Sequence, residues 1–156
     1  FLADTAKNEP FLTSAIRRLD ALVTEIAAAG IPRDRMVLMG FSQGACLAAE
    51  FVYRHPARYG GVVIFSGGLI GPPGTTWATE SPDGAIRSLD GTPIFLGCSD
   101  VDSHVPKARV QETTQIFARM GASVTERIYP GMGHLVVDDE IEHARTVMDR
   151  VLRRDS

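Results

Sequence analysis

Three residues far apart in the sequence carry the side chains that nucleophilic catalysis by a serine requires. Ser42 lies at the centre of a Gly-x-Ser-x-Gly pattern, Asp102 in a polar turn and His134 in a glycine-rich loop. A serine hydroxyl becomes a good nucleophile when an imidazole takes its proton, and a carboxylate must hold that imidazole in the correct tautomer. We therefore expect Ser42 to be a nucleophile, His134 a general base and Asp102 the acid that orients the base.

The sequence around Ser42 predicts a strand that turns sharply into a helix. Apolar residues 36–39 lead into Gly40, and an alanine-rich segment follows Gly44. Because neither glycine has a β-carbon, strand and helix can pack closely around a strained serine whose hydroxyl projects from the sheet. The Gln43 N–H then points to the same spot, so we expect it to be an oxyanion donor.

Other acids and histidines compete for these roles. Asp100 is the alternative acid. We favour Asp102 because the turn and helix start that follow it fix the orientation of its carboxylate, whereas Asp100 is expected to hydrogen-bond within its own turn. A surface loop position is the alternative for His134. No His-x-x-x-His or similar spacing supports a metal site. Of the remaining histidines, His55 is expected to end a helix, His104 to line the site, and His143 to face solvent.

Strand-sized apolar segments alternate with helical patterns along the chain. The expected strands are residues 36–41, 61–65, 93–98 and 123–129, and helices are expected to begin near residues 10, 43, 106 and 138. This alternation predicts an α/β fold with a mainly parallel sheet, helices on both faces and right-handed crossovers. Sites in such sheets form at the carboxyl ends of strands, which is where the three residues above lie. The last helix is expected to bury Ile141, Ala144, Met148 and Val151 and to be capped by Asp138 or Asp139.

Residues 67–91 are predicted to form a long irregular insertion. Glycine, proline, threonine and serine are frequent there, and Leu69, Ile70 and Trp77 are isolated large apolar residues. Loops of this length in a compact domain are usually functional or mobile. Since this loop follows a central strand, we expect these three side chains to wall a shallow substrate groove beside Ser42.

The composition is that of one globular domain spanning residues 1–156, because 156 residues with 44% hydrophobic content can bury one core. The formal charge is -3, and the sequence has no long run of charged residues of either sign, which argues against nucleic acid as a partner. No apolar run reaches membrane-spanning length. Two cysteines, Cys46 and Cys98, form no disulfide framework, so we expect a cytoplasmic protein.

Five motifs along the chain are typical of one known family: Gly30-Ile31-Pro32, residues 40–44, Ser66-Gly67-Gly68, the Asp-x-x-Val-Pro of residues 102–106, and Tyr129 to His134. By these motifs, the chain resembles over almost its whole length the phospholipase/carboxylesterase group of α/β-hydrolases, which includes the acyl-protein thioesterases and small bacterial carboxylesterases. The resemblance implies an α/β-hydrolase fold and a serine esterase with Ser42, Asp102 and His134 in the roles given above. It implies no cofactor, and a small-molecule substrate that is a carboxylic ester, a thioester or a lysophospholipid. It leaves open whether the protein is a homodimer.

Members of that family begin with further strands and a His-Gly loop that supplies a second oxyanion amide, and nothing before Phe1 corresponds to them. We therefore expect roughly 60 to 80 further residues upstream, the length of two or three strand and helix units. The present chain would then be the C-terminal two-thirds of the family domain. A non-catalytic α/β binding module, or an inactive truncated relative, is the alternative to an esterase.

Overall fold

The computed structural model describes residues 5–153, in which strands and helices alternate. The two short 3₁₀ helices are Thr5–Asn8 and Arg33–Arg35. The α-helices are α1 (Phe11–Ala28), α2 (Gln43–Arg54), α3 (Lys107–Arg119) and α4 (Asp138–Leu152). The strands are β1 (Val37–Phe41), β2 (Gly61–Phe65), β3 (Pro93–Ser99) and β4 (Ser123–Tyr129). Each predicted strand is present, with bounds that differ by one residue at most.

The four strands form one sheet in the order β1-β2-β3-β4, and every neighbouring pair is parallel. Helix α2 connects β1 to β2, and α3 connects β3 to β4, whereas residues 66–92 join β2 to β3 without a helix. The structure thus confirms the predicted α/β fold. Its all-parallel order brings the carboxyl ends of the strands to one edge of the sheet.

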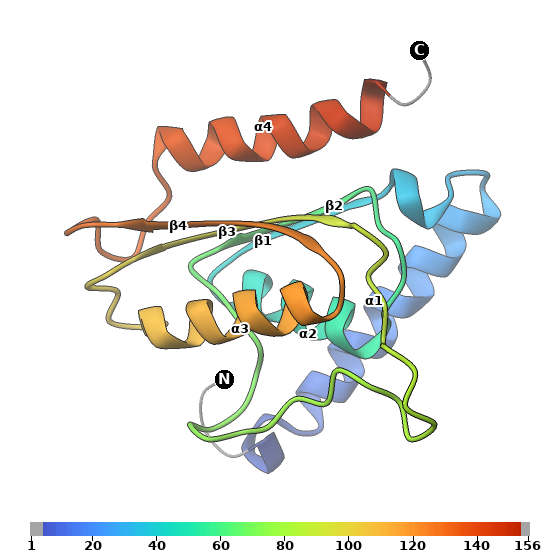
Figure 1. Ribbon diagram of the computed structural model, residues 1–156, viewed down its shortest axis with the longest axis horizontal. Helices are drawn as coiled ribbons and strands as arrows, with labels where there is room; N and C mark the ends of the chain where they lie inside the picture. Colours follow the sequence, from blue (N-terminus) through green and yellow to red (C-terminus); the bar gives the residue numbers. More distant parts are fainter. Residues whose placement is uncertain (1–4, 154–156) are drawn as a thin grey trace.

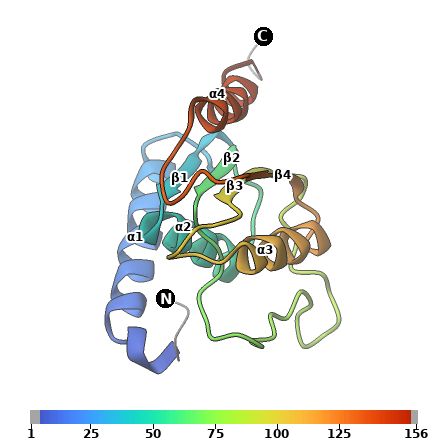
Figure 2. The ribbon, with the colours of Figure 1, turned by 90° about the vertical axis from the view of Figure 1, so that its left-hand side faces the viewer.

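The molecule has three layers (Figure 1), with α4 on one face of the sheet and α1, α2 and α3 on the other. The same layers are seen from the side in Figure 2. Strands β2 and β3 are buried along their whole length, as predicted for central parallel strands. Strand β1 lies at one edge, where Met39 and Phe41 keep 46% and 41% of their surface exposed. None of the helices within residues 5–153 has both the length and the apolar character needed to cross a bilayer.

Helix α4 packs through a face that differs from the predicted one. The carboxyl group of Glu140 is buried against β3, where a β-carbon on Gly97 would lie 2.1 Å from its Oε1. Its Oε2 accepts the N–H of Val137, which occupies the cap position expected for Asp138 or Asp139. Burial raises the pKa of the Glu140 carboxyl. With Glu140 inward, Ile141 and Met148 turn partly outward, and the buried apolar residues are Ala144, Val147 and Val151.

Buried polar groups from α2 and α3 hold the first part of the long loop. The Arg109 guanidinium donates hydrogen bonds to the carbonyls of Leu69 (2.7 Å), Gly71 (2.9 Å) and Pro72 (3.2 Å). Two acceptors complete the attachment: Glu50 receives the N–H of Ile70, and Thr113 receives that of Leu69.

The loop also approaches helix α2 very closely. A β-carbon on Gly67 would lie 2.4 Å from the Cβ of Ala45, so only glycine fits where the loop leaves the sheet. Farther along, the Trp77 ring lies under the Arg109 guanidinium, 4.8 Å from ring centroid to carbon. The loop is therefore irregular in backbone but firmly attached to the helices.

Replacing Arg109 with leucine should lower the free energy of unfolding by about 3 kcal/mol, because buried carbonyls lose their donor. Chemical denaturation measures this loss, and limited proteolysis should show faster cleavage within residues 66–92. Arg119→Leu is the matched control, since Arg119 is an exposed arginine on the same helix. Equal effects of the two substitutions would contradict the role given to Arg109.

Candidate active site

Ser42 lies at the junction between β1 and α2, with backbone angles φ 53° and ψ -116° that a non-glycine residue rarely adopts. The close approach of strand and helix depends on Gly40, where a β-carbon would lie 2.3 Å from the backbone carbon of Gly44. At Gly44 itself, a β-carbon would meet no atom within 4 Å among the described residues outside its chain neighbours and the adjoining backbone of its own helix. The tight turn therefore requires the first glycine of the pattern, whereas the expectation that Gly44 also serves close packing was wrong.

Gln43 is the first residue of α2. The first N–H groups of a helix have no acceptor within the helix, and the helix dipole places partial positive charge there. An anionic oxygen next to Ser42 would therefore meet a donor at the end of a helix.

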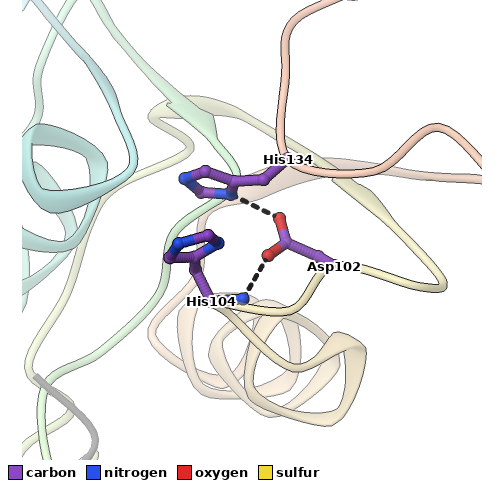
Figure 3. A group of neighbouring side chains, drawn as sticks. All are labelled: Asp102, His104 and His134. Atoms are coloured by element: carbon purple, nitrogen blue, oxygen red, sulfur yellow. Dashed lines mark hydrogen bonds and ion pairs between the residues drawn. The ribbon is translucent and has the colours of Figure 1, made fainter.

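Two hydrogen bonds join the three predicted residues in a row. His134 Nε2 lies 2.9 Å from Ser42 Oγ, and His134 Nδ1 lies 2.7 Å from Asp102 Oδ2. The second contact is drawn in Figure 3. The Asp102 carboxylate is inaccessible to solvent and 17% of the His134 side chain is exposed, so the row runs from the interior to the surface.

Hydrogen bonds keep the Asp102 carboxylate charged although it is buried. Burial raises its pKa, but His134 and the N–H groups of Val105 and His104 together outweigh burial, and the pKa lies below its usual range. Asp102 Oδ1 accepts both backbone groups, at 2.9 Å from Val105 N and 2.8 Å from His104 N. The Cys98 thiol also contacts Oδ2, at 3.9 Å. Burial, strengthened by the negative charge of Asp102, raises the pKa of this thiol to about 12, so it remains protonated.

Two residues at the end of β3 hold the loop that carries His134. Asp100 Oδ1 accepts the N–H of Gly131 at 2.8 Å, and Ser99 Oγ accepts the N–H of Gly133 at 3.0 Å. The expectation that Asp100 bonds within its own turn was therefore wrong, since its partner lies 31 residues along the chain. Ser99 was missed, and no local pattern in the sequence could have identified a contact between the end of a strand and a loop 34 residues away.

A second imidazole lies against His134. The rings of His104 and His134 are stacked, with centroids 4.3 Å apart and planes inclined by 28°. With Asp102 they form a group of possible metal ligands whose atoms lie within 4.8 Å of one another. A metal ion lies in the plane of each imidazole that binds it, and stacked rings do not point their nitrogens at one spot. Because His134 Nδ1 is also engaged with Asp102, the group fits a hydrogen-bonded arrangement better than a metal site.

The structure places the expected groove residues in the core. Leu69, Ile70 and Trp77 are only 0%, 3% and 9% exposed, and they pack in the main hydrophobic cluster of the described residues. His55 caps the end of α2, as expected. His143 is partly buried rather than solvated, because its ring stacks on Phe95 at 4.6 Å.

A cavity of about 480 Å³ opens beside Gln43, between α1 and the start of α2. It has the size of an ordinary small-molecule site. Its lining is mainly apolar and consists of Lys7, Asn8, Phe11, Leu12, Ala15, Gln43, Gly44 and Leu47.

Residues 1–152 match the protein family described as Phospholipase/Carboxylesterase. A protein of Oryza sativa subsp. japonica named as a probable carboxylesterase is 31% identical over 157 residues, covering 96% of this chain and 61% of the relative. Acyl-protein thioesterase 1 of Eremothecium gossypii is 28% identical over 141 residues, covering 86% of this chain and 57% of the relative. Another Oryza sativa relative, 23% identical over 150 residues, is named a probable inactive carboxylesterase.

The crystal structure of a phospholipase/carboxylesterase from Dyadobacter fermentans DSM 18053 has the same fold, with a TM-score of 0.82 and 37% identity. The match covers 97% of this chain and 68% of that protein. The chain thus spans about three fifths of the length of the two curated relatives described first, at 61% and 57%.

The lowered pKa of Asp102 predicts a pH-dependent stability. Its charged form is favoured in the folded state, so its contribution is complete above the unfolded pKa of about 3.9 and is lost as the pH falls through the lower folded pKa. Urea unfolding from pH 7 to pH 2.5 should show that the stability difference between the native chain and Asp102→Asn disappears over that window. Asp149→Asn, at an exposed carboxylate, should show no such step. A difference that stays constant to pH 2.5 would contradict the assignment.

Proposed function

The chain belongs to the phospholipase/carboxylesterase family, and we propose that it hydrolyses carboxylic esters through a covalent acyl-enzyme on Ser42. The observation that carries the proposal is the continuous row of hydrogen bonds from Asp102 through His134 to Ser42 Oγ. A buried carboxylate at one end and an accessible hydroxyl at the other is the arrangement that makes a serine nucleophilic.

In the first half of the reaction, Ser42 Oγ attacks the ester carbonyl carbon while His134 Nε2 takes the hydroxyl proton. The carbonyl oxygen becomes negatively charged in the tetrahedral intermediate, and the Gln43 N–H donates to it. Asp102 stabilises the positive imidazolium and keeps its Nδ1 proton in place. The carbon–oxygen bond to the alcohol then breaks, and His134 gives its proton to the departing alcohol.

In the second half, His134 takes a proton from water, and the resulting hydroxyl attacks the acyl carbon. The bond to Ser42 Oγ breaks, the carboxylic acid leaves, and the proton returns to the serine. A thioester follows the same route with a thiol as the leaving group, so thioesters and lysophospholipids remain within the proposed substrate class. The free buried Cys46 and Cys98 favour a cytoplasmic setting for this chemistry.

We further propose that the acyl chain lies in the cavity beside Gln43. The cavity touches the residue that would donate to the oxyanion, and Phe11, Leu12 and Leu47 supply an apolar wall. This role was expected for Leu69, Ile70 and Trp77, which are buried in the core instead.

A fluorophosphonate probe tests the proposal, because it reacts only with an activated serine. The native chain should be labelled, whereas Ser42→Ala should lose labelling and lose ester hydrolysis by about 10³-fold or more. Ser14→Ala, at an exposed serine of α1, is the matched control and should be labelled normally. Absence of labelling in a folded native chain would favour a non-catalytic binding module.

Filling the cavity should change which acyl chains are accepted. Ala15→Phe is expected to lower kcat/KM for octanoyl esters about tenfold, because each displaced methylene loses about 0.8 kcal/mol of apolar contact, and to leave acetyl esters nearly unaffected. Ser14→Phe adds the same ring at an exposed neighbouring position and should change neither. Equal losses for acetyl and octanoyl esters would place the acyl chain elsewhere.

A further inference from the structure

The imidazole of His134 contacts two other rings, and these contacts have no role in the proton transfers described above. Its centroid lies 4.3 Å from that of His104 and 4.8 Å from that of Phe41, with interplanar angles of 28° and 35°. Figure 3 shows the His104 and His134 rings face to face, with Asp102 at the same end of both. Phe41 is the last residue of β1 and directly precedes Ser42 in the sequence.

The two hydrogen bonds of the His134 ring leave its plane some freedom, because the Cβ–Cγ torsion of a histidine has broad minima and hydrogen bonds tolerate some bending. A turn about this bond carries both ring nitrogens away from their partners, Asp102 Oδ2 at 2.7 Å and Ser42 Oγ at 2.9 Å. Contacts on the faces of the ring limit such a turn, which matters because a misplacement of about 1 Å can cost on the order of 10² in rate.

We propose that His104 and Phe41 are positioning residues that hold the plane of the His134 imidazole so that Nε2 faces Ser42. This inference rests on the proposed function, in which His134 is the base. Neither ring touches the reacting atoms in this role. A pair of stacked or tilted rings is favourable enough to matter here, because loss of one pair corresponds to a factor of about 2 to 12 in an equilibrium.

The side chain of His104 can be changed without disturbing Asp102. Its link to Asp102 is the backbone N–H, which donates to Oδ1 at 2.8 Å. Within the described residues, its ring hydrogen-bonds to Ser103 Oγ at 3.1 Å. The ring is exposed, so its removal creates no buried cavity. A substitution at this position therefore tests the ring contact separately from the row of hydrogen bonds.

His104→Ala should lower kcat about fivefold while KM and the unfolding midpoint stay the same. His104→Phe keeps a flat ring against His134 and should bring kcat back to within about twofold of the native value. Phe41→Leu, which keeps apolar bulk but removes the second ring, should lower kcat by a similar factor. If His104→Phe is as impaired as His104→Ala, the imidazole acts through its nitrogens, and the positioning role is wrong. If His104→Ala keeps the native kcat, the contact has no role.

Nitrogen-15 NMR of the His134 ring gives a readout that needs no turnover. In a Ser42→Ala background, the proton shared between His134 Nδ1 and Asp102 should exchange with water faster after His104→Ala and at the original rate after His104→Phe. Failure of the proposed function would appear as absent fluorophosphonate labelling of the chain that keeps Ser42, while the exchange pattern in the Ser42→Ala background stays as expected. Failure of the positioning role would appear as normal labelling with equal exchange rates in both His104 variants, and that result would overturn it.

Discussion

All four strands run in the same direction, and the arrangement of the site depends on this constraint. Parallel pairing brings the loops after β1, β3 and β4 to one edge of the sheet, so Ser42, Asp102 and His134 meet there although none is near another in sequence. A reversed β4 would carry its following loop to the other edge of the sheet. The short contacts among the three side chains therefore depend first on strand direction, and side-chain packing acts only once the loops share this edge.

Local order at the site comes from side chains that accept or donate several hydrogen bonds between distant segments. The Asp102 carboxylate accepts two backbone N–H groups besides the imidazole, and Ser99 and Asp100 each accept an N–H of the loop before His134. On the helix side, the Arg109 guanidinium holds the long loop in a similar way. The side chains of Ser99, Asp102 and Arg109 are buried, so water competes little for their hydrogen bonds and these bonds constrain their loops strongly.

The sequence predicted the elements well because their signals are local. Residues 61–65 are continuously apolar, as a strand buried on both faces must be, and the glycine pattern around Ser42 marks its turn. The errors concern contacts between distant segments. Leu69 and Ile70 look like isolated apolar residues of an exposed loop, but their buried setting depends on Arg109, some forty residues later. Nothing near Asp100 indicates that its carboxylate receives the N–H of Gly131.

The separation of Ser42 and His134 in the sequence determines when their hydrogen bond can form during synthesis. The two residues are 92 positions apart, and His134 follows the last strand of the sheet. On the ribosome, Ser42 emerges long before its imidazole partner, and β4 must pair with β3 before the two can meet. Until then the hydroxyl is as inert as that of any other serine. Under the proposed function, the Ser42 hydroxyl therefore becomes reactive only after β4 has paired with β3.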